Sequence, residues 1–177
     1  MIATDKIFNI AQRGRAWVFG DDIDTDLIIQ ARYLSASSMG DLARHALELL
    51  APQFASEVRP GDWIVAGENW GCGSAREQAV LVLKQLGVAG VVCVSAARIF
   101  YRNALNNGFP VIEGSALYKE VQTGEDIEID LGQGQIRRLS TERVFPIRSI
   151  PEFMLRILAA GGLLPFLADP NSSCYLG

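Results

Sequence analysis

Cysteine and histidine are scarce in this chain of 177 residues, which has three cysteines and one histidine. The cysteines, Cys72, Cys93 and Cys174, are too widely separated to form a disulfide framework, which indicates a reducing compartment. They also provide fewer closely arranged thiolates than an iron–sulfur cluster needs, and the single His45 does not make a zinc site. We therefore expect this chain alone to form no metal site.

Long apolar runs and runs of one charge are missing as well. No apolar stretch reaches the roughly 18 residues that a membrane span needs, and residues 1–6 lack the basic start and apolar block of a signal peptide. The net charge is −4, with acidic and basic residues mixed along the chain, so we expect no nucleic-acid partner. With 49% hydrophobic residues, the composition indicates a globular, cytoplasmic protein without a membrane segment.

The order of the predicted elements indicates an α/β fold. Short apolar runs at residues 63–66, 88–94 and 109–112 predict buried strands. Between them, apolar residues at helical spacing predict helices that follow residues 74 and 95. Strand, helix, strand, helix, strand in this order predicts a largely parallel βαβαβ core.

The flanking segments predict an antiparallel addition to this core. Alternating apolar residues predict a hairpin of residues 126–131 and 135–139. We also predict a strand at residues 16–19, a helix at 41–50, and a last helix from residue 149 to the glycines at 161–162. Without repeats or linkers, residues 1–177 are predicted to form one domain, with a core at 14–164 and a polar tail at 169–177.

A glycine-rich segment, residues 67–79 with the sequence GENWGCGSAREQA, joins a predicted strand to a predicted helix. Ser74 and Glu77 have the spacing of a capping box, in which the serine accepts from an early helical N–H. Free N–H groups, the helix dipole and the charge of Arg76 together favour an anion, most naturally a carboxylate or phosphate.

The same segment has a simpler interpretation, in which Ser74 only caps the helix. The segment has neither the Gly-Lys-Ser/Thr ending of a P-loop nor the Gly-x-Gly-x-x-Gly spacing of a dinucleotide turn, which argues against a nucleotide. A helix dipole could make Cys72 reactive here, but we favour a structural role for this thiol. We likewise interpret His45 as a partly exposed helix residue rather than a ligand.

Four carboxylates fall within six residues, at Asp21, Asp22, Asp24 and Asp26. Charges this close repel one another, and a simple turn does not require four of them. We interpret Asp21 and Asp22 as a solvated acidic loop, with one or two of the four carboxylates capping backbone N–H groups. Asp24 and Asp26 lead into the apolar residues 27–29, at the entrance of a buried element, where a carboxylate is more often functional.

Three segments taken together resemble a known family. They are residues 20–26 with 31–34, residues 67–79, and residues 97–103 with 106–108. In this order and spacing, they resemble the small subunit of 3-isopropylmalate dehydratase, in the swivelling-domain branch of the aconitase superfamily. The resemblance extends from residue 14 to residue 164 and implies an aconitase-type swivelling domain.

The resemblance also implies a two-subunit hydro-lyase of leucine biosynthesis that is active only with its large subunit. In that family the large subunit carries a [4Fe-4S] cluster, whose free iron acts as a Lewis acid on a small dicarboxylate substrate. The reaction isomerises 3-isopropylmalate to 2-isopropylmalate through isopropylmaleate. The small subunit binds no cluster and supplies the remaining groups.

Individual residues carry over from the family pattern. Ser74 matches the catalytic serine, whose alkoxide removes the proton from the carbon next to the one that bears the hydroxyl. Asp26 matches a second catalytic residue, an aspartate that helps position the groups handling the leaving hydroxide. Arg76 matches the arginine that grips a substrate carboxylate. The substrate-binding residues implied by the resemblance are Arg76, Ala75, Gly73, Ser35, Arg32 and Thr25.

Three residues depart from the family pattern: Ala75 replaces a second serine, Gln78 replaces a histidine, and Gln30 replaces a proline. The missing hydroxyl at Ala75 makes citramalate or 2,3-dimethylmalate the first alternative substrates. Relatives acting on tricarboxylates such as homoaconitate carry an arginine where this chain has Ser35. A small neutral residue cannot pair with a third carboxylate, which favours an alkyl-substituted malate.

Two other interpretations stay open. One is a homoaconitase small subunit, against which Ser35 argues. The other is a non-catalytic module whose glycine-rich turn binds a small anion, with Ala75 as a mark of lost activity. Replacing Ser74 with alanine separates a catalytic subunit from a binding module.

Overall fold

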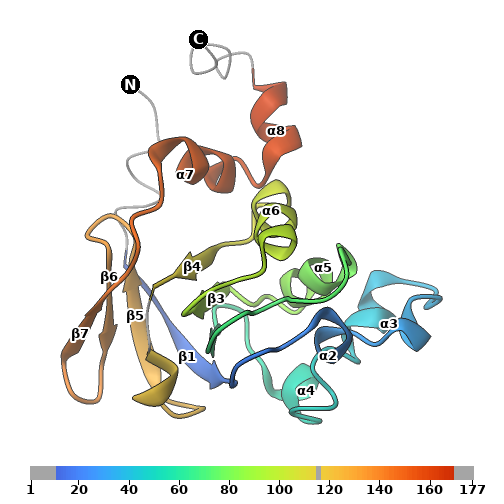
Figure 1. The fold of residues 1–177 in the computed structure, drawn as a ribbon, viewed down its shortest axis with the longest axis horizontal. Coiled ribbons are helices and arrows are strands. Elements are labelled where there is room, and N and C mark those ends of the chain that lie inside the picture. The colour runs from blue at the N-terminus through green and yellow to red at the C-terminus, as the bar shows by residue number, and fades with distance from the viewer. Residues whose placement is uncertain (1–10, 115–116, 170–177) are drawn as a thin grey trace.

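The structure is a computed structural model that describes residues 11–114 and 117–169, and its central feature is a seven-stranded sheet (Figure 1). In spatial order the strands are β4 (Val111–Glu113), β3 (Gly90–Cys93), β2 (Trp63–Ala66), β1 (Gln12–Val18), β5 (Asp126–Asp130), β6 (Gln135–Arg138) and β7 (Arg143–Pro146). The helices are α2 (Thr25–Ile28), α3 (Met39–Ala43), α4 (Phe54–Glu57), α5 (Gln78–Gln85), α6 (Arg98–Asn106), α7 (Glu152–Ala159) and α8 (Leu163–Ala168), with 3-10 turns at Ala31–Tyr33 and Leu117–Lys119.

The parallel half of the sheet contains β1 to β4. Strand β2 pairs in parallel with both β1 and β3, and β3 pairs in parallel with β4. In chain order, β2, α5, β3, α6 and β4 alternate, so the predicted parallel βαβαβ core is confirmed. Every residue of β2 and β3 is buried, as expected for strands covered on both faces.

The antiparallel half contains β5, β6 and β7, seen at the left of Figure 1. The predicted hairpin is confirmed as β5 and β6, whereas β7 was not predicted because its mostly exposed residues show no apolar alternation. Strand β1 joins the two halves, since it pairs in parallel with β2 and antiparallel with β5. Gly14 lies in β1 where a Cβ would overlap the carbonyl of Gly61, so this close approach requires glycine.

Alternate residues of the parallel strands pack on opposite faces of the sheet. In β2, Ile64 and Ala66 contribute to a core formed with helices α3 to α6. Trp63 and Val65 face a second core, formed with the segment after β4 and with the apolar residues of β5 and β6. The sheet is therefore the middle layer of the molecule.

Two predicted helices differ from those observed. The predicted helix at residues 41–50 is shorter than expected, since α3 ends at Ala43, and the positive φ of 56° at Leu47 excludes a helix that continues to residue 50. The predicted last helix is confirmed as α7, but a second helix, α8, follows the glycines at 161–162. Within the described ranges, no helix is long and apolar enough to cross a membrane. The prediction of one domain stays a prediction, and residues 1–6 and Cys174 lie outside the described residues.

The topology brings the three motif segments to one edge of the sheet. Parallel strands place their carboxyl ends at the same edge, where α/β proteins bind ligands. The acidic segment follows β1, the glycine-rich segment follows β2, and residues 97–103 follow β3. This edge of the sheet is therefore the expected location of a functional site.

Candidate active site

Backbone hydrogen bonds join the three segments directly. Thr25 N donates to the carbonyl of Cys72 at 2.9 Å, and Gly71 N donates to the carbonyl of Ile23 at 2.7 Å. Ala97 N, just before α6, donates to the carbonyl of Trp70 at 2.8 Å. The glycine-rich turn is thus held between the acidic loop and the start of α6.

Glycines give the turn its shape. Gly71 and Gly73 have φ values of 74° and 88°, in a region that other residues rarely adopt. A Cβ at Gly71 would overlap the ring of Phe100 in α6, so the turn lies directly against this helix. A Cβ at Gly73 would lie in ordinary contact with Asp24 and Thr25, 3.6 Å away, so the turn also lies against the start of α2, while Gly73 itself is exposed.

Ser74 lies at the surface of this turn and contacts a buried hydroxyl. Its Oγ is 2.9 Å from Oγ1 of Thr25, which is 1% exposed at the start of α2. The predicted capping box is wrong, because α5 begins only at Gln78 and Glu77 precedes it without a side-chain cap. The contact with Thr25 replaces the cap that the local sequence favours.

Arg76 points back toward the acidic segment. Its Nη1 donates to Oδ1 of Asp26 at 2.7 Å and to the carbonyl of Ile29 at 3.0 Å. The arginine side chain is 14% exposed and the aspartate side chain 59%. The hydrogen bond from Arg76 is the main cause that lowers the pKa of Asp26. Among the described residues, Nε and Nη2 of Arg76 have no hydrogen-bond partner, which leaves one edge of the guanidinium available.

The turn also presents free backbone donors. In the part of the chain that the structure covers, the N–H groups of Gly73, Ser74 and Ala75 donate to no acceptor. All three residues are exposed. Consecutive free N–H groups beside a positive φ form a concave surface that binds anions. These free N–H groups support the predicted anion site. The helix α5 begins only at Gln78, four residues after Ser74, so its dipole contributes less than the sequence suggested.

The other carboxylates of the acidic segment have structural partners. Asp24 caps α2, where its Oδ1 accepts from Leu27 N at 2.8 Å. Asp21 Oδ1 accepts from Glu68 N at 2.7 Å, and Asp22 Oδ1 accepts from the amide of Asn69 at 2.9 Å. Capping by one or two carboxylates is confirmed. Asp21 and Asp22 are exposed as expected, but they also tether the glycine-rich turn.

Two predicted substrate-binding residues do not contact this group. Arg32 donates to Oε1 of Glu48 at 2.9 Å, and its guanidinium lies over the ring of Tyr33. Ser35 is exposed in the loop that follows. Both residues belong to the segment directly after Ile29, whose carbonyl holds Arg76.

The sequence interpretation missed Glu48. Its carboxylate accepts from Gln30 at 2.6 Å and from Arg32, and its Oε2 lies 2.9 Å from Nδ1 of His45. Burial raises its pKa, but the groups of Tyr33, His45 and Arg32 outweigh burial and lower the pKa to about 2. No local pattern marks Glu48, because its partners lie 3 to 18 positions away.

Among the described residues, His45, Cys72 and Cys93 have surroundings that account for them without a metal. The half-buried His45 ring stacks on Tyr33, with centroids 3.7 Å apart. Burial and the charges of Asp24 and Asp22 raise the pKa of the Cys72 thiol, and burial raises that of Cys93 to about 12. Within residues 11–114 and 117–169, no group of three or more His, Cys, Asp or Glu side chains could hold a metal. The described residues therefore do not fit an iron–sulfur cluster.

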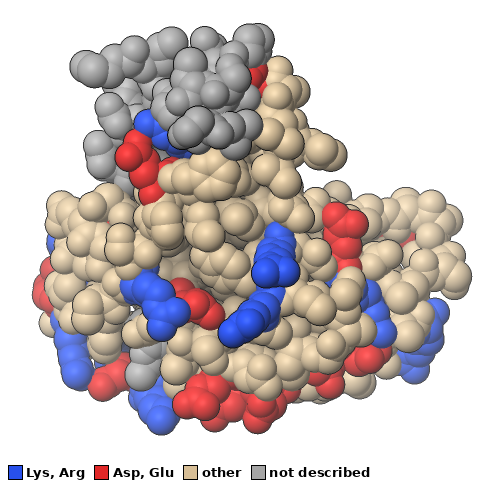
Figure 2. All heavy atoms as spheres, turned by 45° about the horizontal axis from the view of Figure 1, so that its top comes forward, with Lys and Arg blue, Asp and Glu red and all other residues tan. Residues whose placement is uncertain are grey.

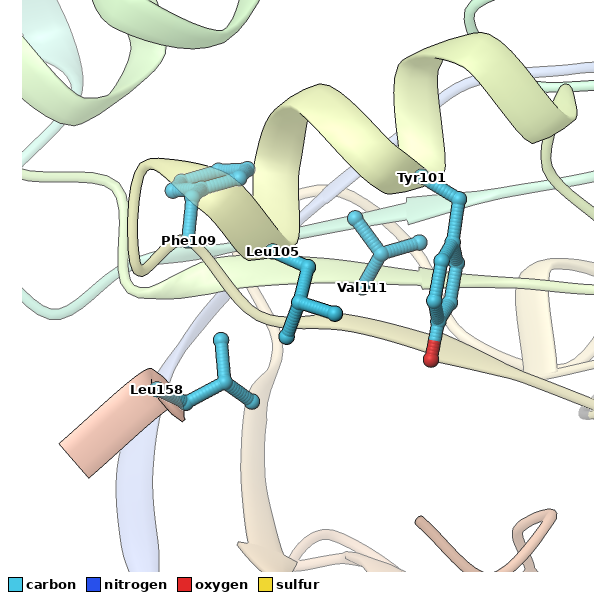
Figure 3. Close-up of a pocket in the computed structure, with 5 residues that line it drawn as sticks. All are labelled: Tyr101, Leu105, Phe109, Val111 and Leu158. Carbon is cyan, nitrogen blue, oxygen red and sulfur yellow. The ribbon is translucent and has the colours of Figure 1, made fainter. Parts of the chain in front are cut away.

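A small hollow lies between α6, β4 and α7 (Figure 3), and its lining includes none of the residues grouped around Ser74 and Arg76. The residues that line it are Tyr101, Leu105, Phe109, Val111 and Leu158. The Tyr101 hydroxyl contacts the sulfur of Met154 at 3.7 Å. Without a charged side chain among these five residues, the hollow does not suit a carboxylate ligand.

The surface charge is mixed. On the face in Figure 2, basic side chains near the middle are interspersed with acidic ones, and acidic side chains gather along the lower margin. Several charges are paired, including Arg148 with Glu113 at 3.1 Å and Arg143 with Glu120 at 2.7 Å. A face of this kind does not favour a polyanion such as nucleic acid.

Comparisons with known proteins agree with the fold. Residues 21–115 match the aconitase C-terminal domain family. The chain is 50% identical to the 3-isopropylmalate dehydratase small subunit 1 of Methanopyrus kandleri, over 93% of this chain and 97% of that protein. The crystal structure of 3-isopropylmalate dehydratase from Methanocaldococcus jannaschii superposes with a TM-score of 0.86 and 40% identity, covering 95% of this chain and 100% of that one.

Relatives with other printed activities are nearly as similar. The isopropylmalate/citramalate isomerase small subunit of Methanocaldococcus jannaschii is 46% identical over 88% of this chain and 92% of that protein. The methanogen homoaconitase small subunit of Methanothermobacter thermautotrophicus is 49% identical over 86% of this chain and 88% of that protein. Overall identity therefore does not discriminate between substrates.

Proposed function

Because the chain belongs to the aconitase C-terminal domain family, with the small subunits of 3-isopropylmalate dehydratases, we propose that it is the small subunit of a two-subunit hydro-lyase acting on 3-isopropylmalate. The observation that carries the proposal is the exposed Ser74 hydroxyl, bonded to Thr25 and two residues from an arginine held by Asp26. The enzyme interconverts 3-isopropylmalate and 2-isopropylmalate through isopropylmaleate, a step of leucine biosynthesis.

Ser74 is the base of this reaction. Its alkoxide takes the proton from the carbon next to the one that bears the hydroxyl, the electrons of that C–H bond form the double bond, and hydroxide leaves. A serine is a poor base unless its anion is stabilised. The hydroxyl of Thr25 lies within hydrogen-bonding distance of Ser74 Oγ, and the free N–H groups at positions 73–75 are further donors in the same turn that would stabilise this anion.

Arg76 binds a substrate carboxylate with the edge that is free. Nη1 is occupied by Asp26 and Ile29, so Nε and Nη2 remain for a two-pronged contact with a carboxylate. Asp26 fixes the orientation of the guanidinium in this arrangement. The N–H groups of Gly73 and Ala75 are further hydrogen-bond donors for the negatively charged carboxylate.

The exposure of the site favours a partner protein that covers it. Gly73, Ser74, Ala75 and Asp26 are all exposed, so this chain alone does not exclude water from a bound substrate. The described residues do not fit a metal cluster, and we assign the [4Fe-4S] cluster to a large partner subunit. When bound, that cluster supplies Lewis-acid chemistry at the substrate hydroxyl.

The substrate is an alkyl-substituted malate in this proposal. Ser35 is small, neutral and exposed, so it offers no charge to a third carboxylate. Citramalate and 2,3-dimethylmalate are the alternatives, because Ala75 lacks a hydroxyl that would contact the substrate. The citramalate alternative is also supported by the similar M. jannaschii protein, which is named for both isopropylmalate and citramalate.

The test is activity of the chain reconstituted with its cluster-bearing large subunit. Dehydration and rehydration are measured on 3-isopropylmalate, citramalate, 2,3-dimethylmalate and homocitrate. We expect the highest kcat/KM with 3-isopropylmalate. The highest value with homocitrate would refute the argument from Ser35, and activity that survives without this chain would refute its role as a required subunit.

A further inference from the structure

The segment that holds Arg76 is itself held by residues 45–48. Leu47 N donates to the carbonyl of Ile28 at 2.9 Å. Two positions further on, the amide of Gln30 donates to Glu48 at 2.6 Å. The Ile29 carbonyl, which accepts from Arg76, lies between these two anchored residues.

Glu48 is the centre of this attachment. One of its oxygens accepts from Gln30 and Arg32, while the other faces Nδ1 of His45. The His45 ring in turn stacks on Tyr33, nearly parallel at 8°. Glu48 therefore ties both ends of residues 30–33 to one carboxylate whose side chain is 23% exposed.

A continuous path of contacts runs from this carboxylate to the guanidinium. Glu48 holds Gln30, Gln30 adjoins Ile29, and the Ile29 carbonyl accepts from Nη1 of Arg76 at 3.0 Å. The backbone of Ala31 also interacts with the carboxylate of Asp26, the other partner of Nη1. The Ile29 carbonyl, one of the two acceptors of Nη1, thus depends directly on the position of this segment.

We propose that Glu48 is a positioning residue for Arg76, acting through Gln30 and the backbone of residues 29–31. The role of Arg76 in substrate binding rests on the proposed function, whereas the structural link between Glu48 and the segment does not. Glu48 keeps the free edge of Arg76 aimed at the carboxylate site without touching the substrate.

Gln30 provides a way to test this path. Its φ of −71° and ψ of 142° suit proline, and Ile29 before it is extended, with φ −150° and ψ 119°. Among the described residues, the N–H of Gln30 donates to no acceptor. Proline at this position would fix the same backbone without a side-chain bond to Glu48.

The experiment compares Glu48→Gln, Gln30→Pro and the double variant, each reconstituted with the large subunit. We expect Glu48→Gln to raise KM for 3-isopropylmalate about tenfold with a smaller change in kcat, since a full 1 Å misplacement can cost about a hundredfold. Gln30→Pro should keep the wild-type KM, and in the double variant it should restore most of the loss.

The matched control is Glu125→Gln, which also removes a carboxylate paired with an arginine, Arg138, at 2.6 Å. It lies beside the antiparallel strands, so KM should stay unchanged. An unchanged KM in Glu48→Gln, or a loss that Gln30→Pro does not reverse, would overturn the proposal.

A second readout separates this proposal from the proposed function. Amide hydrogen exchange of residues 28–34 is measured in the full chain, with no substrate or partner. We expect faster exchange in Glu48→Gln, wild-type exchange in the double variant, and no change in this segment in Glu125→Gln. If exchange follows this pattern while the wild-type complex lacks activity, the proposed function fails and the positioning contact stands. If exchange is unchanged in Glu48→Gln, the positioning role is refuted whatever the activity.

Discussion

The hydroxyl oxygens of Thr25 and Ser74 lie 2.9 Å apart, although the residues are 49 positions apart in the chain. Thr25 is buried at the start of α2, and Ser74 is exposed in the turn that precedes α5. This hydrogen bond therefore fixes a reactive surface group from beneath. In our account, it is one of the interactions that make the serine basic enough to remove a proton.

Replacing Thr25 with valine removes this hydroxyl and nearly keeps the side-chain shape. We expect kcat to fall about two- to tenfold, because one hydrogen bond contributes roughly 0.5–1.5 kcal/mol. Steady-state kinetics on 3-isopropylmalate measure the effect. The control is Thr123→Val, which removes a hydroxyl that accepts from Val18 N and should leave kcat unchanged. Equal kcat values for the wild type and Thr25→Val would contradict the role of Thr25.

Replacing Arg76 with lysine keeps the charge but loses the planar, two-pronged donor. We expect kcat/KM to fall about tenfold to a hundredfold, since hydrogen bonds to charged groups contribute roughly 1.5–3 kcal/mol. Asp26→Asn should have a smaller effect in the same direction, because the amide oxygen still accepts from Nη1. In a double-mutant cycle the two effects should be non-additive. Additive effects would show that Asp26 does not act through Arg76.

Replacing Gly71 with alanine should destabilise the turn strongly. The added Cβ would overlap Phe100, and the φ of 74° is unfavourable for alanine. We expect the free energy of unfolding to fall by about 3 kcal/mol, from overpacking together with backbone strain. Gly124→Ala is the control, because it has a positive φ but open space, and it should lose only about 1–2 kcal/mol. Urea unfolding measures both, and equal losses would contradict the packing argument.

The lowered pKa of Glu48 predicts that the stability of the chain depends on pH. Its pKa is lowered from 4.5 to about 2 in the folded chain, so its stabilisation is fully present above pH 4.5 and is lost as the pH falls towards 2. We expect the wild type to exceed Glu48→Gln in free energy of unfolding by about 1–3 kcal/mol at pH 7. The difference should shrink steadily between pH 4.5 and 2 in urea unfolding. A difference that does not depend on pH would exclude this ionisation as its cause.

The parallel core could be predicted because its signal is local. The residues of β2 and β3 form continuous apolar runs, and each run is followed by a helix at recognisable spacing. The segments that were missed lack such a signal. Strand β7 is largely exposed. The helix expected up to residue 50 ends at Ala43, and further on the backbone N of Leu47 donates to the distant Ile28.

The candidate site was predictable only in part, because its geometry depends on contacts between distant residues. The sequence identified Ser74, Arg76 and Asp26, and the structure joins the last two in an ion pair. The capping box failed because α5 begins only at Gln78, and Ser74 is hydrogen-bonded instead to Thr25 at the start of α2. Glu48 carries no pattern of its own, and its importance appears only when Gln30 and His45 are seen around it.

The most direct test of the account is the turnover of Ser74→Ala in the complex with the large subunit. The exposed Ser74 makes one side-chain hydrogen bond within the described residues, to Thr25, so the variant should fold. We expect kcat on 3-isopropylmalate to fall about 10²–10⁴-fold, the usual contribution of a positioned base, with little change in KM. A Ser74→Ala complex that turns over as fast as the wild type would contradict the claim that Ser74 removes the proton.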